Sequence, residues 1–444
     1  MSESTETIVA ISTPPGEGAV AMLRVSGPEA FVVAKRLFRS RVSFERMLPR
    51  HLYFGHIVEE AVPVDEGLCA IFHAPASYTG ENLVELSHHG GMMVAAQVLR
   101  LALDSGARLA HPGEFTQRAF LNGKMDLTRA EAVMDLIRAQ TLQAMRAAAL
   151  QLDGSLSRAI ETIRSELIHI LSHIETSIDF PEDGLEPDTG GTLLKRIFQV
   201  RQQIDTLLST ENQGRLLREG IRLTICGPPN AGKSSLLNQL LKCDRAIVSQ
   251  FPGTTRDTLE ESASLKGMLF RITDTAGIHH TSDLIELEGI RRSFAAAERA
   301  DVILYVVDAA QPQPLPPPAG LPEDRLHLVW NKIDLLREPF SYLPTSAAVS
   351  CRTGAGVPQL ISRIVEWAGG LGHSSGQLVA INARHQSCLK RAVASLKHAS
   401  DLANGVELVA FELQTALSAI GEVTGAVDHE EILDSVFSNF CIGK

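Results

Sequence analysis

Apolar residues are spaced in two different ways along this chain of 444 residues, and each spacing predicts its own kind of structure. Up to about Lys124, short apolar runs alternate with turns rich in Pro and Gly, which is typical of strands. The runs are Ile8 to Ile11, Val20 to Val25, Cys69 to Phe72 and Leu83 to Leu86, with a helix-like segment at Met92 to Leu103. We therefore expect an N-terminal α/β domain in residues 1–124.

From Thr128 onward the apolar residues are three and four positions apart, which is the spacing of helices. Thr128-Arg129-Ala130-Glu131 fits a capping box and predicts a helix start. Further helices are predicted at Leu193 to Leu208 and at Glu407 to Ile420. The longest stripe follows Gly154 and consists of Ile160, Ile163, Leu167, Ile170, Leu171, Ile174 and Ile178.

Composition and charge narrow the class of protein. A hydrophobic content of 44% and a charged content of 21% are ordinary for a globular protein, and no apolar run approaches the ~18 residues that span a bilayer. We expect a cytoplasmic protein without a membrane span. The six cysteines are scattered, which favours neither a disulfide framework nor a zinc site. A net charge of −11 argues against non-specific coating of nucleic acid, although it allows a local basic groove or a basic partner.

The strand-like run Ile221 to Cys226 leads into the phosphate loop, Gly227-Pro228-Pro229-Asn230-Ala231-Gly232-Lys233-Ser234. Its glycines let backbone N–H groups face a phosphate, Lys233 adds a positive charge, and Ser234 can hold Mg²⁺. The helix that follows begins at Ser235, which we include among the nucleotide-binding residues.

Three further motifs follow strand-like runs and predict GTP as the nucleotide. Asp274-Thr275-Ala276-Gly277 is suited to the Mg²⁺ shell and the γ-phosphate. Asn331-Lys332-Ile333-Asp334 ends in a carboxylate that can accept the N1–H and 2-amino group of guanine, which adenine cannot offer. Ser350-Cys351-Arg352 supplies the expected backbone contact to the base O6.

GTP hydrolysis needs a group other than the usual glutamine to orient the attacking water. Ile278, which follows Asp274 to Gly277, has no polar group for this task. The segment Ser249 to Asp257 contains Thr255 as a candidate second Mg²⁺ ligand. Asn230 and backbone carbonyls of this segment are oxygen ligands that could hold a monovalent cation.

Helical patterning lies on both sides of the nucleotide-binding motifs, so we expect a helical domain that contains an inserted domain. The expected boundaries are 125–216 for the first helical part, 217–372 for the inserted P-loop domain and 373–444 for the second helical part.

These motifs together resemble the MnmE (TrmE) family of tRNA modification GTPases. The resemblance rests on Asn230 to Asn238, Gly253 to Asp257, Asp274 to Gly277 and the C-terminal tail, Cys441-Ile442-Gly443-Lys444, and it extends over the whole chain. It implies an N-terminal folate-binding domain that also dimerises, a central helical domain and an inserted Ras-like G domain.

For the G domain, the resemblance implies that paired G domains bind K⁺ as well as GTP and Mg²⁺. The K⁺ ligands would be the Asn230 side chain, carbonyls near Ser249 and Phe251, and Thr254. Ser234 and Thr255 would hold Mg²⁺. The water-positioning glutamate aligns with Glu286, and Glu288 is the alternative.

For the N-terminal domain, the resemblance places Arg24, Glu85, Lys124 and Lys444 around 5,10-methylenetetrahydrofolate, or 5-formyltetrahydrofolate as a bound analogue. A carboxylate can pair with a pterin edge, and cations can neutralise the glutamate tail of a folate. Without the resemblance, the clusters that contain Arg24, Glu85 and Lys124 are typical of solvated turns. Cys441 matches a cysteine with a candidate catalytic role, and an inert tail thiol is the alternative.

The implied activity is the addition of a carboxymethylaminomethyl-type group at C5 of the wobble uridine of tRNA. The implied partners are a second copy of the chain in a homodimer, the flavoprotein MnmG (GidA) in a heterotetramer, and tRNA. Two alternatives stay open at this point: a GTP-dependent switch in ribosome assembly or signalling, and a folate-dependent one-carbon enzyme with a regulatory G domain.

Overall fold

The structure is a computed structural model that describes residues 6–179, 191–243, 260–274, 294–311, 315–336, 346–368, 380–401, 405–426, 430–438 and 440–444. The chain divides into two compact units. The first contains residues 1–134, 157–168 and 414–444, and the second contains residues 135–156 and 169–413. Both units therefore include helical segments that are distant in sequence.

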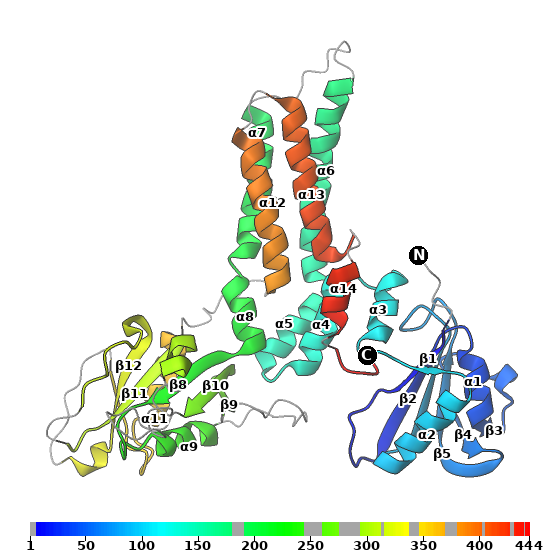
Figure 1. The fold of residues 1–444 in the computed structure, drawn as a ribbon, viewed down its shortest axis with the longest axis horizontal. Coiled ribbons are helices and arrows are strands. Elements are labelled where there is room, and N and C mark those ends of the chain that lie inside the picture. The colour runs from blue at the N-terminus through cyan, green and yellow to red at the C-terminus, as the bar shows by residue number, and fades with distance from the viewer. Residues whose placement is uncertain are drawn as a thin grey trace. The chain divides into compact units, whose positions relative to one another are not determined.

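A seven-stranded sheet with the order β3-β4-β5-β6-β2-β1-β7 forms the centre of the first unit. Its strands are β1 (Ile8–Ile11), β2 (Val20–Ser26), β3 (Phe38–Ser40), β4 (Tyr53–Glu59), β5 (Val62–Phe72), β6 (Leu83–His89) and β7 (Arg108–Leu109). The helices α1 (Ala30–Leu37) and α2 (Met92–Asp104) pack on one face, where they bury Leu23 and Val25 of β2 (Figure 1). Because side chains alternate along a strand, Arg24 and its cross-strand neighbour Glu85 belong to the other face.

The C-terminal segment packs on the helices that follow this sheet. These helices are α3 (Glu114–Leu121) and α4 (Leu127–Arg138), and the C-terminal helix is α14 (Glu430–Phe437). They share an apolar cluster of Leu127, Ala130, Met134, Leu433, Phe437 and Phe440. The C-terminal tail therefore lies in the same unit as the N-terminal residues.

The predicted capping box at Thr128 is wrong, because α4 begins one residue earlier, at Leu127. The carboxylate of Asp126 caps the helix by accepting the backbone N–H of Arg129 at 3.0 Å. Thr128 donates its hydroxyl to the same carboxylate at 2.7 Å. Asp126 is a strong capping residue, so the position before a motif can decide where a helix starts.

The helical part of the second unit includes α5 (Leu142–Leu152), α7 (Gly191–Leu208), α8 (Glu211–Glu219) and α12 (Ala383–Asp401). The helices α6 (Ser155–Asp179) and α13 (Val406–Thr424) contribute to both units. The helices α7 and α12 lie side by side (Figure 1). The predicted stripe on α6 is buried from Ile160 to Ile174, whereas Ile178 is 37% exposed. None of the helices in the described ranges is long and apolar enough to cross a membrane.

A six-stranded sheet with the order β13-β12-β11-β8-β10-β9 forms the inserted domain. Its strands are β8 (Ile221–Cys226), β9 (Glu260–Leu265), β10 (Met268–Asp274), β11 (Val302–Asp308), β12 (Leu326–Asn331) and β13 (Ala347–Ala348). All neighbours are parallel except β9 and β10. The carboxyl ends of the parallel strands therefore meet at one edge, where ligands of open α/β sheets bind.

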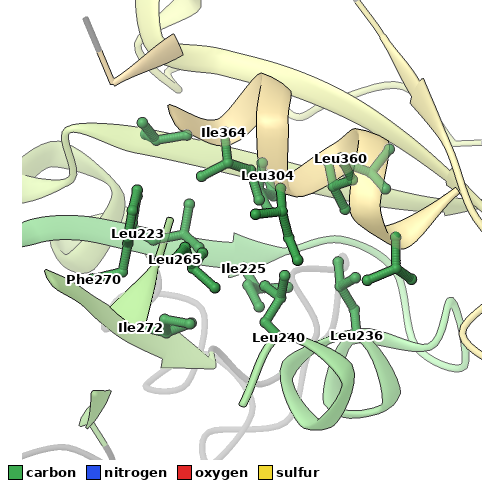
Figure 2. Close-up of a cluster of buried hydrophobic side chains, with 14 of the residues drawn as sticks. Leu223, Ile225, Leu236, Leu240, Leu265, Phe270, Ile272, Leu304, Leu360 and Ile364 are labelled. Carbon is green, nitrogen blue, oxygen red and sulfur yellow. The ribbon is translucent and has the colours of Figure 1, made fainter. Parts of the chain in front are cut away.

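Each face of this sheet has its own apolar core. The helices α9 (Lys233–Cys243) and α11 (Val357–Trp367) cover one face, where Leu223, Phe270 and Leu304 are fully buried (Figure 2). Residues 294–299 are helical and contribute to a second cluster with Tyr305 and Leu321. Burial on both faces explains why β11 is continuously apolar from Val302 to Val307.

The buried side chains in Figure 2 allow us to predict how much stability the domain would lose if one of them were shortened. We expect Leu304→Ala to destabilise the inserted domain by about 2–5 kcal/mol, because Leu304 is fully buried among α9, α11 and the sheet. Both tryptophans of the chain, Trp330 and Trp367, lie in this domain, so tryptophan fluorescence during urea unfolding reports on it. Leu315→Ala is the control, since Leu315 is 57% exposed and should change stability by less than about 0.5 kcal/mol. Equal effects of both changes would contradict this description of the core.

Candidate functional site

The phosphate loop connects β8 to α9, as its sequence predicts. Gly227 has φ 140° and lies so close to β11 that an added Cβ would be 2.2 Å from the Val306 carbonyl oxygen. The Lys233 ammonium donates to the carbonyls of Gly227 and Pro228 at 3.1 and 3.0 Å, which holds it inside the loop. Ser234 and Ser235 are exposed in the first turn of α9, whose N–H groups suit an anion.

Asn331 connects the phosphate loop to the segment 350–352. Its side-chain amide donates to the Ala231 carbonyl at 2.9 Å, and its oxygen accepts the Cys351 N–H at 3.1 Å. A Cβ at Gly232 would lie 2.2 Å from the Asn331 amide nitrogen, so this connection requires glycine there. Asn331 is 2% exposed, and its observed role is to hold two loops together.

Asp334 presents an oriented carboxylate at the carboxyl edge of the sheet. The Ser350 hydroxyl donates to its Oδ1 at 2.6 Å, and the exposed Arg352 lies 3.2 Å from its Oδ2. The Ser350 hydrogen bond, more than the Arg352 charge, keeps the pKa of Asp334 below its usual value, so the group is ionised at neutral pH. An acceptor of this kind fits the donor edge of guanine.

One contact at this edge was not predicted from sequence. Lys332 has a left-handed backbone, and its ammonium binds Asp308 at the end of β11 at 2.7 Å. Asp308 is a single acidic residue after an apolar strand, and only its place at the strand end could have indicated it. Burial raises the pKa of the Cys351 thiol to about 11, which makes it a packing group.

Several predicted nucleotide and metal residues lie outside the described residues. They are Ser249, Phe251, Thr254, Thr255, Thr275, Ala276, Gly277 and Glu286. Asp274 ends β10 at the expected edge. Asn230 is exposed and has a left-handed backbone with φ 59°. These residues stay predictions as ligands or catalytic groups.

A second polar site lies in the first unit, and we call it the Arg24 cluster: Arg24, Tyr78, Glu85, Phe115 and Lys444. The Arg24 guanidinium donates to Glu85 through Nε and Nη2 at 3.0 and 2.8 Å. It also lies 5.2 Å from the Tyr78 ring centre and 5.7 Å from that of Phe115, within cation–π range. The cluster thus offers paired charges next to aromatic surface.

The C-terminal tail forms one side of this cluster. The Gly443 carbonyl accepts the Ser12 hydroxyl at 3.2 Å and Arg24 Nη1 at 3.5 Å. Gly443 has φ 96°, and an added Cβ would lie 2.6 Å from the Ile11 carbonyl oxygen. Burial, and then the nearby Arg24 charge, lower the pKa of the Lys444 ammonium, although Glu85 opposes this shift.

The other two predicted residues are less closely joined to the cluster. Lys124 donates its ammonium to the Pro75 carbonyl at 2.9 Å, in the same loop as Tyr78. Cys441 is partly buried and packs against the apolar cluster of α4 and α14. Its backbone carbonyl accepts the Gly113 N–H at 3.4 Å. Its predicted catalytic role stays a prediction beside this packing role.

The loop that carries Tyr78 is held by a buried ion network that sequence reasoning missed. Arg118 is 4% exposed and binds both Glu81 and Glu114, and Glu114 also binds Arg108. Burial opposes ionisation of Glu114, but hydrogen bonds from Arg108, the His111 N–H and Arg118 lower its pKa to about 2. Tyr78 itself hydrogen-bonds Thr116 at 2.9 Å, so α3 fixes the aromatic wall of the cluster.

Comparison with known proteins decides the family. A family model described as the MnmE helical domain matches residues 127–441, and one described as the N-terminus of the GTP-binding protein TrmE matches residues 7–124. A tRNA modification GTPase MnmE of Akkermansia muciniphila is 45% identical over 100% of both chains. That of Levilactobacillus brevis is 41% identical over 99% of this chain and 98% of its own. The chain belongs to the MnmE family of tRNA modification GTPases.

Family membership agrees with the observed architecture of an N-terminal α/β domain, a helical domain and an inserted Ras-like G domain. Among solved structures, Aquifex aeolicus Era bound to GDP and AlF4⁻ is 24% identical, with a TM-score of 0.27. That match covers 39% of this chain and 66% of Era. The G domain of the Thermotoga maritima FeoB iron transporter is also 24% identical, covers 33% of this chain and 98% of its own, and has a TM-score of 0.25.

The geometry of the tail predicts the effect of a small change. We expect Gly443→Ala to release the tail, because its Cβ would clash with Ile11 and a left-handed alanine costs about 1–2 kcal/mol. Carboxypeptidase B should then remove Lys444 from the variant roughly tenfold faster than from the wild type. Free peptides with the two tail sequences correct for any direct effect of the substitution on the protease. Ile442→Ala is the control, since Ile442 is 52% exposed. Equal trimming rates for the wild type and Gly443→Ala would show that Gly443 does not hold the tail.

Proposed function

We propose that the protein is a K⁺-dependent GTPase that acts in the cytoplasm as a homodimer and as a heterotetramer with an MnmG (GidA) flavoprotein. Together they would add a carboxymethylaminomethyl-type group at C5 of the wobble uridine of certain tRNAs, with the one-carbon unit taken from methylenetetrahydrofolate. The observation that supports this most is that one chain contains a phosphate loop, a carboxylate that suits guanine and the Arg24 cluster. Full-length relatives named as tRNA modification GTPases support the same proposal.

In the G domain, the chain's own groups bind and orient the nucleotide. The first turn of α9 and Lys233 would hold the phosphates, and Asp334, oriented by Ser350, would select guanine. Ser234 and Thr255 would hold Mg²⁺, which supplies positive charge at the β- and γ-phosphates. Asn230, Thr254 and carbonyls at Ser249 and Phe251 would hold K⁺. Glu286 would orient the attacking water, in place of the missing glutamine.

In the N-terminal domain, the Arg24 cluster would hold the folate. Glu85 offers a carboxylate to the donor edge of a pterin, and the rings of Tyr78 and Phe115 offer apolar surface beside it. Lys444 and Lys124 would neutralise the anionic tail of the cofactor. In this arrangement, the tail closes the site through Gly443, and Cys441 lies close to it in sequence.

The proposed role of K⁺ and Glu286 can be tested on the purified protein. We expect GTP turnover to be at least tenfold faster in K⁺ than in Na⁺ at equal ionic strength, because the cation would replace an arginine finger worth about 10³–10⁵ in rate. Glu286→Ala should reduce turnover by about 10²-fold or more while GTP affinity stays within about twofold. Glu298→Ala is the control, since Glu298 is exposed in the same domain. Equal rates in K⁺ and Na⁺ would sink the cation mechanism.

The proposed reaction itself is tested on tRNA. In cells that lack this protein, mass spectrometry should find the wobble uridines of the affected tRNAs without the C5 group. A plasmid carrying the wild-type sequence should restore the modification. A plasmid carrying Lys233→Ala should not restore it, because the phosphate loop would lose the lysine ammonium that binds the phosphates. Fully modified wobble uridines in the deletion strain would refute the proposed function and favour one of the switch-type alternatives.

A further inference from the structure

The short helix α8 is where the inserted G domain joins the helical part of the second unit. The chain enters the G domain directly after α8, through Gly220 into β8, and it returns just before α12, at Ala380 and Ile381. Both crossings lie at α8. Gly214 passes so near the return crossing that an added Cβ would be 2.2 Å from the Ile381 carbonyl oxygen.

Arg218, two residues before the entry crossing, binds the return crossing and the helical domain at once. Its Nε donates to the Asp135 carboxylate on α4 at 2.7 Å. Its Nη1 donates to the Ile381 carbonyl at 2.9 Å, and its Nη2 donates to the Ala380 carbonyl at 3.3 Å and to Gln151 on α5 at 3.4 Å. The Arg218 and Asp135 side chains are only 22% and 24% exposed, so solvent weakens their attraction less than on an open surface.

Apolar contacts strengthen this joint on the same face of α8. Ala147 of α5, Leu217 of α8 and Ala380 of the return crossing form a small buried cluster. Residues 214, 217 and 218 are three and four positions apart, which places them on one side of the helix. That side of α8 therefore belongs to the helical domain.

The G domain packs on other residues of α8: Leu216, which lies opposite Gly214 and Arg218 on the helix, contacts the apolar core of the G-domain sheet. Arg215 binds Asp301 at 2.8 Å, and Asp301 also accepts the Arg222 N–H of β8 at 2.9 Å. At the end of α8, the Glu219 carbonyl accepts Nε of Arg271 at 2.6 Å. Arg271 belongs to β10, the strand that ends at Asp274 of the acidic nucleotide motif. Arg271 therefore connects β10 directly to the end of α8.

We propose that α8 couples the nucleotide state of the G domain to the helices α4 and α5, and that Arg218 is the positioning residue that makes this joint rigid. The proposal rests on the proposed GTPase function, because it assumes that the nucleotide changes the position of β10. Arg218 suits this role, since a guanidinium presents five donors in a planar fork. A lysine has three donors on a flexible stem and cannot reproduce the same set of bonds.

Hydrogen exchange on the full-length protein tests the coupling. We expect exchange at backbone amides of residues 135–152 to differ between the GDP state and the state with GDP and aluminium fluoride in K⁺. Arg218→Lys should lose this nucleotide-dependent difference while GDP affinity stays within about twofold, because the phosphate loop is untouched. Asp135→Asn removes the same ion pair from the other side and should give the same loss. Arg222→Gln is the matched control, since among the described residues that side chain pairs with Glu219 alone, at 3.3 Å, and both side chains are about half exposed.

Each result distinguishes coupling from a purely structural role. If both Arg218→Lys and Asp135→Asn keep the nucleotide-dependent difference, Arg218 does not couple the domains. If both variants lose GDP binding, α8 is a folding element of the G domain and the proposal is overturned. Wobble-uridine modification is measured separately on the same variants. Its absence in the wild type, with the exchange difference intact, would refute the proposed tRNA function and leave the coupling standing.

Discussion

The nucleotide site depends on one buried amide, the side chain of Asn331. It joins the Ala231 carbonyl of the phosphate loop to the Cys351 N–H in the segment 350–352. An amide can donate and accept at the same time, so one residue fixes both segments, and no room is left for a side chain at Gly232. The parallel sheet brings these segments to one edge, and Asn331 sets their spacing there. A change at this amide would therefore affect phosphate and base recognition together.

The sequence predicted the first strand of the G domain closely, because four of its six residues are apolar and the phosphate loop marks its end. The expected strand Ile221 to Cys226 matches β8. The sequence did not predict α3 or α8, whose polar faces are engaged in ion pairs, so their apolar spacing is weak. The start of α4 was misplaced for another reason: the capping-box pattern pointed to Thr128, whereas Asp126, the stronger capping residue, caps the helix.

The candidate sites show the same limit. Asp334 and the phosphate loop were predicted, because a few residue types at fixed spacing carry their chemistry. The Arg24 cluster was expected only from a family resemblance, since Arg24, Tyr78 and Lys444 are far apart in sequence. The ion network behind it was not expected at all. Arg118, Glu81 and Glu114 resemble solvated charges until the fold buries them against one another. Buried ion pairs of this kind contribute little net stability, but removing one partner is costly.

An inserted domain is connected by two chain crossings, and its neighbour can follow its movements only if both crossings are held. A single crossing would act as a hinge, and movements of the G domain would then be lost as rotation about it. In this chain the return segment bonds to Arg218, close to the entry segment, while Arg271 of β10 and Asp301 bind α8 from the G domain. The helix is only nine residues long, so it bends little between its contacts with the two domains. A short helix that guanidinium groups join to both domains is thus a stiff connection between the G domain and the helical domain.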